Sequence, residues 1–149
     1  AYGHATAALD AVSDPLVMST AQAAAQEAYR DAGVGPRDIG VAEVHDCFSI
    51  TELMLYEALG FAEPGRGIDL VKDGTTALEG RLPVNTGGGL LAFGHPVGAT
   101  GVKQALEIFK QQKGLAGAYQ VRGRPTYGIA ANIGGDDRTA VVTVFRNVT

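Results

Sequence analysis

The chain has 149 residues, which is enough for one domain with its own core, and 46% of the residues are apolar. Its net charge of −4 is mild, and no run of Lys or Arg is typical of a nucleic-acid-binding surface. No stretch of about eighteen consecutive apolar residues is present, so the sequence predicts no membrane-spanning helix. We therefore expect one domain, 1–149, that binds neither nucleic acid nor a membrane.

The single cysteine excludes an internal disulfide framework, and a reducing, cytoplasmic location is expected. The first residues lack both the charged and the apolar region of a signal peptide. Because residue 1 is Ala rather than Met, we expect the chain to be a processed or truncated piece. The last three residues do not form a peroxisomal targeting tripeptide.

The first half of the chain alternates between strand-like and helix-like patterns. An Ala-rich stretch favours a helix, Ser19 or Thr20 is suited to cap its start, and Gly33 is suited to end it. A second helix shows apolar residues at helical spacing and ends at Gly60. The predicted elements of this half are strands at 1–8 and 41–44 and helices at 19–32 and 49–59.

The second half begins with a long connection, 61–81, which is rich in turn residues. Pro96 is suited to be the first residue of a third helix, which carries Val102, Leu106 and Phe109 on one face. The other predicted elements are strands at 82–85, 127–131 and 139–145, with a hairpin turn at 134–137. Strands and helices that alternate and then close with two strands predict an α/β fold with a mixed sheet.

Three segments place unusual residues at the ends of predicted strands. The first is His45-Asp46-Cys47-Phe48, between a strand and a helix, where the sites of α/β proteins usually lie. A thiol near the start of a helix experiences the helix dipole, which favours the thiolate. The structural alternative is that Cys47 is a small buried residue and His45 a hydrogen-bonded turn residue.

The second segment is 85–101, in which two glycine clusters flank a histidine. His95 directly precedes a helix, whose free N–H groups favour anions, and a histidine there can donate to an oxygen on which negative charge develops. Glycines let a backbone approach a ligand closely, so the candidate substrate loop consists of Gly88, Gly89, Gly94 and Pro96. The alternative is a flexible loop with a solvated histidine and glycines that only allow close helix packing.

The third segment, 132–135, follows a β-rich stretch, and by itself it is best explained as a hairpin turn with Asn132 and glycine at positive φ. The neighbouring pair, Asp136-Asp137, is expected to be a solvated turn rather than a metal site. His45, Cys47 and His95 are residue types that bind zinc, but their spacing matches no structural zinc site, so no metal is predicted.

Together these segments resemble the thiolase superfamily, and the resemblance extends over essentially the whole chain. Residues 85–101 are similar to its highly specific signature, which contains Asn-x-Gly-Gly followed by Gly-His-Pro-x-Gly-Ala-x-Gly. His45-Asp46-Cys47-Phe48 resembles the matching segment of the sterol-carrier-protein-x type thiolases, where common thiolases carry Asn-Glu-Ala-Phe. Asn132-Ile133-Gly134 lies where common thiolases carry Cys-x-Gly, and the sterol-carrier type likewise has Asn there.

The resemblance implies a fold and a role for each candidate residue. Thiolases stack two similar βαβαβαββ halves in five layers, and this chain is similar to the second half only, with a five-stranded mixed sheet and helices on both faces. His95 is implied to activate a nucleophilic cysteine of the N-terminal half and to line an oxyanion hole, in which His45 takes the place of a water-holding asparagine. Cys47 is implied to be the general acid/base, and Gly134 to donate a backbone N–H to a second oxyanion hole.

The implied activity is that of an acyltransferase that cleaves or forms 3-ketoacyl-coenzyme A, with coenzyme A as a substrate and no further cofactor. Cys47 is the only thiol, so the nucleophile has to come from an N-terminal half, on a longer parent chain or on a partner subunit. We therefore expect the isolated chain to be inactive and the full enzyme to be a homo-oligomer.

Two alternative functions remain open at this point. One is a thiolase-like lyase that cleaves steroid side-chain thioesters by a retro-aldol reaction, a class that often pairs with a small zinc-bearing protein. The other is a non-catalytic scaffold that binds lipid or coenzyme A. Cys47 favours the acyltransferase over the lyase, and the retained histidines argue against the scaffold.

Overall fold

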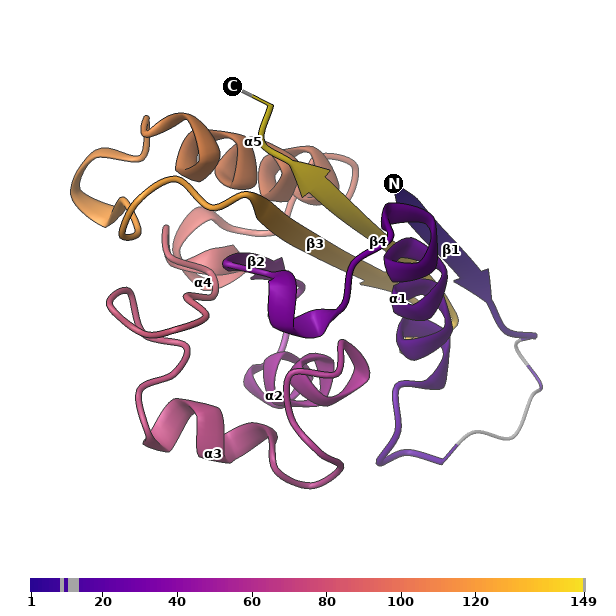
Figure 1. Cartoon of the computed structure of the whole chain (residues 1–149). Coiled ribbons are helices and arrows are strands. Elements are labelled where there is room, and N and C mark those ends of the chain that lie inside the picture. Colours follow the sequence, from indigo (N-terminus) through magenta and orange to yellow (C-terminus); the bar gives the residue numbers. More distant parts are fainter. Residues whose placement is uncertain (9, 11–13, 149) are drawn as a thin grey trace.

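The computed structural model describes residues 1–8, 10 and 14–148. In Figure 1, β3 and β4 run through the middle of the molecule, and α3 lies at the end opposite α5. Short 3₁₀ turns at Pro36–Asp38 and Gly117–Tyr119 link some of the elements. The helices and strands, in chain order, are β1 (Tyr2–Thr6), α1 (Ser19–Ala32), β2 (Val41–Val44), α2 (Ser49–Ala58), α3 (Gly67–Lys72), α4 (Gly89–Phe93), α5 (Thr100–Lys113), β3 (Tyr127–Gly134) and β4 (Thr139–Arg146).

The sheet is mixed, as predicted, but it has four strands in the order β1-β4-β3-β2. β4 pairs antiparallel with both β1 and β3, and β2 pairs parallel with β3. The expected fifth strand is wrong, because residues 82–85 contribute only a single parallel bridge between Ala42 and Val84. Pro83 has no N–H to donate, and Asn85 adopts a positive φ of 49°, so the chain leaves the sheet directly after the bridge.

Helix α1 packs on one face of the sheet through small side chains. Ala24 and Ala28 are fully buried against β1, and Gly3 permits this close approach, because a Cβ at residue 3 would lie 1.9 Å from the Ala24 carbonyl oxygen. Helix α2 extends the same core beside α1. The largest buried side chains of this core are Leu55, Tyr56, Leu59, Leu82, Ile129 and Val142.

The start of α1 differs from the prediction. Ser19 and Thr20 lie inside the helix, and Met18 occupies the cap position without a side-chain hydrogen bond. The backbone N–H groups of Thr20 and Ala21 instead donate to the carboxylate of Asp137, at 2.9 Å each. The expectation of a solvated Asp136-Asp137 turn is therefore wrong for Asp137, which is half-buried and caps a helix that precedes it by more than a hundred residues.

Helix α5 covers the other face of the sheet, so helices lie on both faces as predicted. Ile108 is fully buried there with Val41. The helix begins at Thr100 rather than at Pro96, because the Pro96 carbonyl accepts hydrogen bonds from the Ala99 and Thr100 N–H groups and residues 96–99 form a turn. Val102, Leu106 and Phe109, which were predicted to share one face of this helix, are exposed rather than packed in the core.

Two short helices lie where the sequence predicted connections. Helix α3 is part of the long segment 61–81, and its first residue, Gly67, is buried against α2, where a Cβ would lie 2.3 Å from the Leu53 carbonyl oxygen. Helix α4 follows the glycine cluster, and the N–H of Leu90 in its first turn donates to Asp46 at 2.8 Å. Helices of five or six residues are not stable by propensity alone, so tertiary contacts decide their formation.

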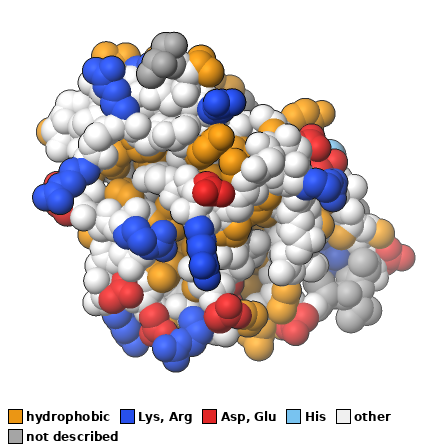
Figure 2. Space-filling view, viewed as in Figure 1, with side chains coloured by type: hydrophobic (Ala, Val, Ile, Leu, Met, Phe, Trp, Pro, Cys, Tyr) orange, Lys and Arg blue, Asp and Glu red, His pale blue; other side chains and the backbone are white. Residues whose placement is uncertain are grey.

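The surface combines charged and apolar regions. Figure 2 shows hydrophobic side chains reaching the surface across the middle of one face, with many charged side chains along its lower edge. Large exposed apolar side chains of α5 and the preceding turn are Val97, Val102, Leu106 and Phe109. Within the described part of the chain, none of the helices combines the length and apolar character needed to cross a membrane.

Candidate active site

The carboxyl end of β2 carries the first group of candidate residues. His45 directly follows the strand and is 4% exposed, and Asp46 and Cys47 come next, before α2 begins. One oxygen of Asp46 accepts the Leu90 N–H, which joins this strand end to the start of α4. Gly89 fits beside Asp46 because a Cβ there would lie 2.3 Å from the other carboxylate oxygen.

The rings of His45 and His95 are in edge-to-face contact, with centroids 4.7 Å apart and planes at 88°. Burial lowers the pKa of His45, and the neighbouring His95 lowers it further, whereas Asp46 and the side chain of Asn132 oppose the shift. His45 is therefore neutral at pH 7, and its buried Nδ1 has no hydrogen-bond partner. The pair brings together two loops that are fifty residues apart in the sequence.

Thr100 fixes the orientation of the His95 ring. The Thr100 hydroxyl donates to the Pro96 carbonyl oxygen at 3.2 Å, so its oxygen is left to accept from Nδ1–H of His95 at 2.6 Å. We therefore assign the proton of neutral His95 to Nδ1. This tautomer leaves Nε2 with a free lone pair that can accept a proton and afterwards donate it.

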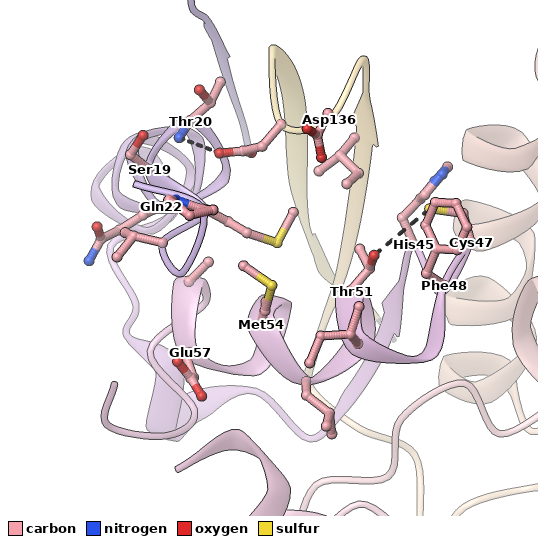
Figure 3. Close-up of a pocket in the computed structure, with 18 of the residues that line it drawn as sticks. Ser19, Thr20, Gln22, His45, Cys47, Phe48, Thr51, Met54, Glu57 and Asp136 are labelled. Carbon is pink, nitrogen blue, oxygen red and sulfur yellow. Dashed lines mark hydrogen bonds between the residues drawn. The ribbon is translucent and has the colours of Figure 1, made fainter. Parts of the chain in front are cut away.

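Cys47 lies at the mouth of the same site. Its side chain is exposed, and its sulfur lies 4.0 Å from the hydroxyl oxygen of Thr51, one turn into α2. Figure 3 shows Cys47 beside His45 and Phe48, on the far side of the β3–β4 hairpin from α1. A cavity of about 1380 Å³ is lined by His45, Cys47, His95, Asn132 and Gly134 together with apolar side chains of the segment before α1 and of α2.

Asn132 and Gly134 enter this site from the end of β3. The Asn132 side-chain amide donates to Gln104 of α5 at 3.2 Å, and Gln104 in turn donates to the Ala131 carbonyl oxygen at 3.2 Å. Asn132 lies in the strand, and the positive φ angles expected at this turn occur at residues 135–137 instead. The buried Gln104 thus orients Asn132 toward the histidine pair.

A pair of buried acidic residues lies between β2 and α5, close to the site. Glu43 is 3% exposed, and burial, followed by the charge of Glu107, raises its pKa to about 8. Burial acts against ionisation of Glu107 as well, but hydrogen bonds from Lys103 and Lys110 outweigh it and lower the Glu107 pKa. Lys103 also lies 3.3 Å above the ring centre of Phe93 in α4. Glu43 is therefore largely protonated at pH 7, beside an ionised Glu107.

The structure divides the predicted candidates into two groups. His45, Cys47, His95, Asn132 and Gly134 line one cavity, as the resemblance implied. The predicted substrate-loop residues shape the backbone around that cavity rather than lining it: Gly88, Gly89, Gly94 and Pro96. Their contact with a substrate stays a prediction.

Sequence reasoning missed several residues that support the site. Thr100 orients His95, Gln104 orients Asn132, and Glu43 is buried beside Glu107 of α5. Among residues 1–8, 10 and 14–148, no group of three His, Cys, Asp or Glu side chains is arranged to hold a metal.

Comparison with known protein families identifies the family of this chain. The family model described as "Thiolase C-terminal domain-like" matches residues 1–147. The chain belongs to this family. The resemblance inferred from the motifs is thus confirmed for the thiolase C-terminal half.

Relatives include an acetyl-CoA acetyltransferase of Methanothermobacter thermautotrophicus, 48% identical over 82% of this thiolase domain. Sterol carrier protein 2 of Rattus norvegicus is 44% identical over 83% of it. The domain spans 32% and 22% of the length of these two proteins. Among solved structures, the Ltp2-ChsH2(DUF35) aldolase shares the fold, with a TM-score of 0.81 and 24% identity over 98% of this chain and 38% of that chain.

Proposed function

We propose that this domain is the C-terminal half of a thiolase-type acyltransferase that cleaves or forms 3-ketoacyl-coenzyme A. One observation carries the proposal: side chains from three segments that are far apart in the sequence line a single cavity, in which His95, Cys47 and Asn132 accompany a neutral His45. The relationship to an acetyl-CoA acetyltransferase supports coenzyme A thioesters as substrates. A reducing, cytoplasmic location is part of the proposal, because the exposed Cys47 has to remain a free thiol.

In the cleavage direction, Nε2 of His95 accepts the proton of a nucleophilic cysteine that the preceding half contributes. The thiolate sulfur forms a bond to the 3-keto carbon, and the Gly134 N–H stabilises the oxygen that becomes negative. When the bond between carbons 2 and 3 breaks, its electron pair passes to the thioester part, which becomes an enolate. Protonated His95 donates a hydrogen bond to the enolate oxygen.

The enolate requires a proton, and the Cys47 thiol supplies it to carbon 2, which releases acetyl-coenzyme A. The thiol of a second coenzyme A molecule then returns a proton to the Cys47 thiolate and attacks the acyl carbon of the acyl-enzyme. The C–S bond to the nucleophilic cysteine breaks, and the released cysteine thiolate recovers its proton from His95. The neutral state of His45 suits this sequence, because a cation beside His95 would disfavour protonation of the His95 ring.

The preceding half is the partner that this scheme requires, and we propose that it covers the outward face of α5. Val102, Leu106 and Phe109 are 73%, 45% and 49% exposed there. Val102 also lines a groove that is formed with the open face of β4, which includes Val141 and Phe145. The related proteins are roughly two and a half to four times as long as this domain, so they contain chain that can bury such a face.

The test is an assay of the complete enzyme with a 3-ketoacyl-coenzyme A and free coenzyme A. We expect His95→Ala to lower kcat by about two to three orders of magnitude, as the loss of an oxyanion donor does. Cys47→Ala is expected to form the acyl-enzyme but to protonate the enolate slowly, which deuterium incorporation at carbon 2 would reveal. Wild-type kcat in His95→Ala would reject the role of His95. Cleavage of a 3-hydroxyacyl thioester without added thiol would establish a retro-aldol lyase instead.

A further inference from the structure

The turn between β3 and β4 has a conformation that its own residues do not favour. Gly135, Asp136 and Asp137 have consecutive φ values of 60°, 57° and 61°. Glycine adopts the left-handed region readily, but two side-chain-bearing residues in it cost free energy, even though aspartate is among the residues that tolerate it best. Within the turn, the Arg138 N–H donates to the carbonyl oxygens of Gly134 and Gly135, at 3.1 Å each.

The start of α1 lacks hydrogen-bond acceptors of its own for its free N–H groups. Its cap residue, Met18, offers no side-chain acceptor, and its first turn contains no acidic residue. Free N–H groups at a helix start need acceptors. Asp137 supplies them, since its Oδ2 accepts from the Thr20 N–H and its Oδ1 from the Ala21 N–H, both at 2.9 Å. The dashed line at Thr20 in Figure 3 marks one of these bonds.

This contact joins two walls of the active-site cavity. The segment that leads into α1 forms one wall, with Met18 and Thr20, and the β3–β4 turn forms the other. Gly134, whose N–H is the proposed oxyanion donor, lies three residues before Asp137, at the end of β3. The two bonds thus tie the turn that follows β3 to α1, in addition to the ladder pairing of Gly134 with Thr139.

We propose that Asp137 is a positioning residue for the acyltransfer reaction: its carboxylate pins the β3–β4 turn to the start of α1 and so holds the Gly134 N–H in place. The inference rests on the function proposed above. Both oxygens act as acceptors here, each for a different N–H, and asparagine, which also tolerates a left-handed backbone, keeps only one of them. Loss of both oxygens releases the turn.

The decisive variant is Asp137→Gly in the complete enzyme, because glycine removes the carboxylate and suits the positive φ. We expect kcat to fall at least about 10-fold with little change in KM, since small displacements of a catalytic group slow the chemical step strongly. Asparagine keeps only one of the two acceptor oxygens, so Asp137→Asn should have a kcat between those of wild type and Asp137→Gly. Asp38→Gly is the matched control, because Asp38 also accepts a backbone N–H, that of Gly35, but lies outside the cavity.

Hydrogen exchange separates this proposal from the proposed function. In Asp137→Gly, we expect faster amide exchange at Thr20, Ala21 and Gly134, whereas Asp38→Gly leaves these amides unchanged. If the wild-type enzyme shows no thiolysis, the proposed function fails, and the exchange rates still test the clamp. Unchanged kcat and unchanged exchange at Gly134, accompanied only by a lower unfolding temperature, would show that Asp137 is a purely structural cap and overturn the proposal.

Discussion

Helices α1 and α5 have the same length of fourteen residues and lie on opposite faces of one sheet, yet they bury opposite kinds of side chain. Helix α1 buries mainly alanines and leaves polar residues in solvent. Helix α5 turns polar residues inward and apolar ones outward. The buried polar side chains of α5 are Thr100, Gln104, Glu107, Gln111 and Gln112.

The buried glutamines of α5 explain part of this inversion. Gln104 bonds the end of β3, and Gln111 donates to Thr86 and to the Tyr119 carbonyl oxygen at 2.8 Å each, so the helix acts as a hydrogen-bonded support for the site loops. The outward apolar stripe has no such partner within the described part of the chain. Helix α1 therefore completes its packing within this domain, whereas α5 leaves an apolar face exposed, which the proposed preceding half would cover.

The largest expected effect concerns the packing of α1 against β1. A Cβ in Gly3→Ala would overlap the Ala24 carbonyl oxygen at 1.9 Å, so strand and helix have to separate. We expect the free energy of unfolding to fall by about 3 kcal/mol in urea titrations. Gly35→Ala is the control, because a Cβ there meets only an Asp38 oxygen at 3.9 Å. Equal stability of the two variants would contradict the close packing described for α1.

The second prediction concerns the outward face of α5. The double substitution Leu106→Asp and Phe109→Asp should weaken association with a separately produced preceding half by at least about 30-fold, which corresponds to 2 kcal/mol. The free energy of unfolding of the domain itself should change by less than about 0.5 kcal/mol. Calorimetric titration measures the first quantity. Leu115→Asp, on an exposed side chain beyond the end of α5, serves as the control.

The third prediction concerns Thr100, the first residue of α5. Thr100→Val removes the hydroxyl that bonds Nδ1 of His95, so the ring loses its fixed orientation and tautomer. We expect kcat of the complete enzyme to fall about 10-fold, in line with the loss of a hydrogen bond to a group that becomes charged. Thr100→Ser keeps the hydroxyl and should retain most of the activity. Full activity of the Val variant would remove Thr100 from the mechanism.

The smallest expected effect is the pH dependence of the free energy of unfolding that arises from Glu43, which is buried between β2 and α5. Because the pKa of Glu43 rises from 4.5 to about 8 on folding, the folded state binds more protons than the unfolded state between these values. The Glu43 contribution to stability is therefore lost as pH rises toward 8. Gln does not titrate, so Glu43→Gln should gain at least about 1 kcal/mol relative to wild type between pH 5 and pH 8.

Unfolding in urea at several pH values measures this gain. The charged groups that face Glu43 are Glu107 and Lys103 of α5, Asp46 after β2 and Glu52 of α2, and none of them changes in the variant. Glu63→Gln, at an exposed position, controls for the loss of one carboxylate. A difference between variant and wild type that does not vary with pH would show that Glu43 is not the titrating group.

Local sequence determined much of this molecule. The Ala-rich run specifies α1, and Gly33 and Gly114 end the two long helices in the left-handed conformation, because glycine adopts it at little cost. The motif residues specify the family, and mixed sheets bring the ends of parallel strands to one edge, which is why His45 and Asn132, at the ends of the parallel strands β2 and β3, were predictable as neighbours.

Tertiary structure alone decided the rest, because those features depend on atoms far apart in the sequence. The short helices α3 and α4 form where buried contacts and the Asp46 carboxylate support them, the fifth strand shrinks to one bridge, and the cap of α1 comes from Asp137, 117 residues from Thr20. The orientation of α5 likewise follows from buried hydrogen bonds rather than from its pattern of apolar residues. A helical pattern shows that a face is apolar, and only the packing shows which layer will cover it.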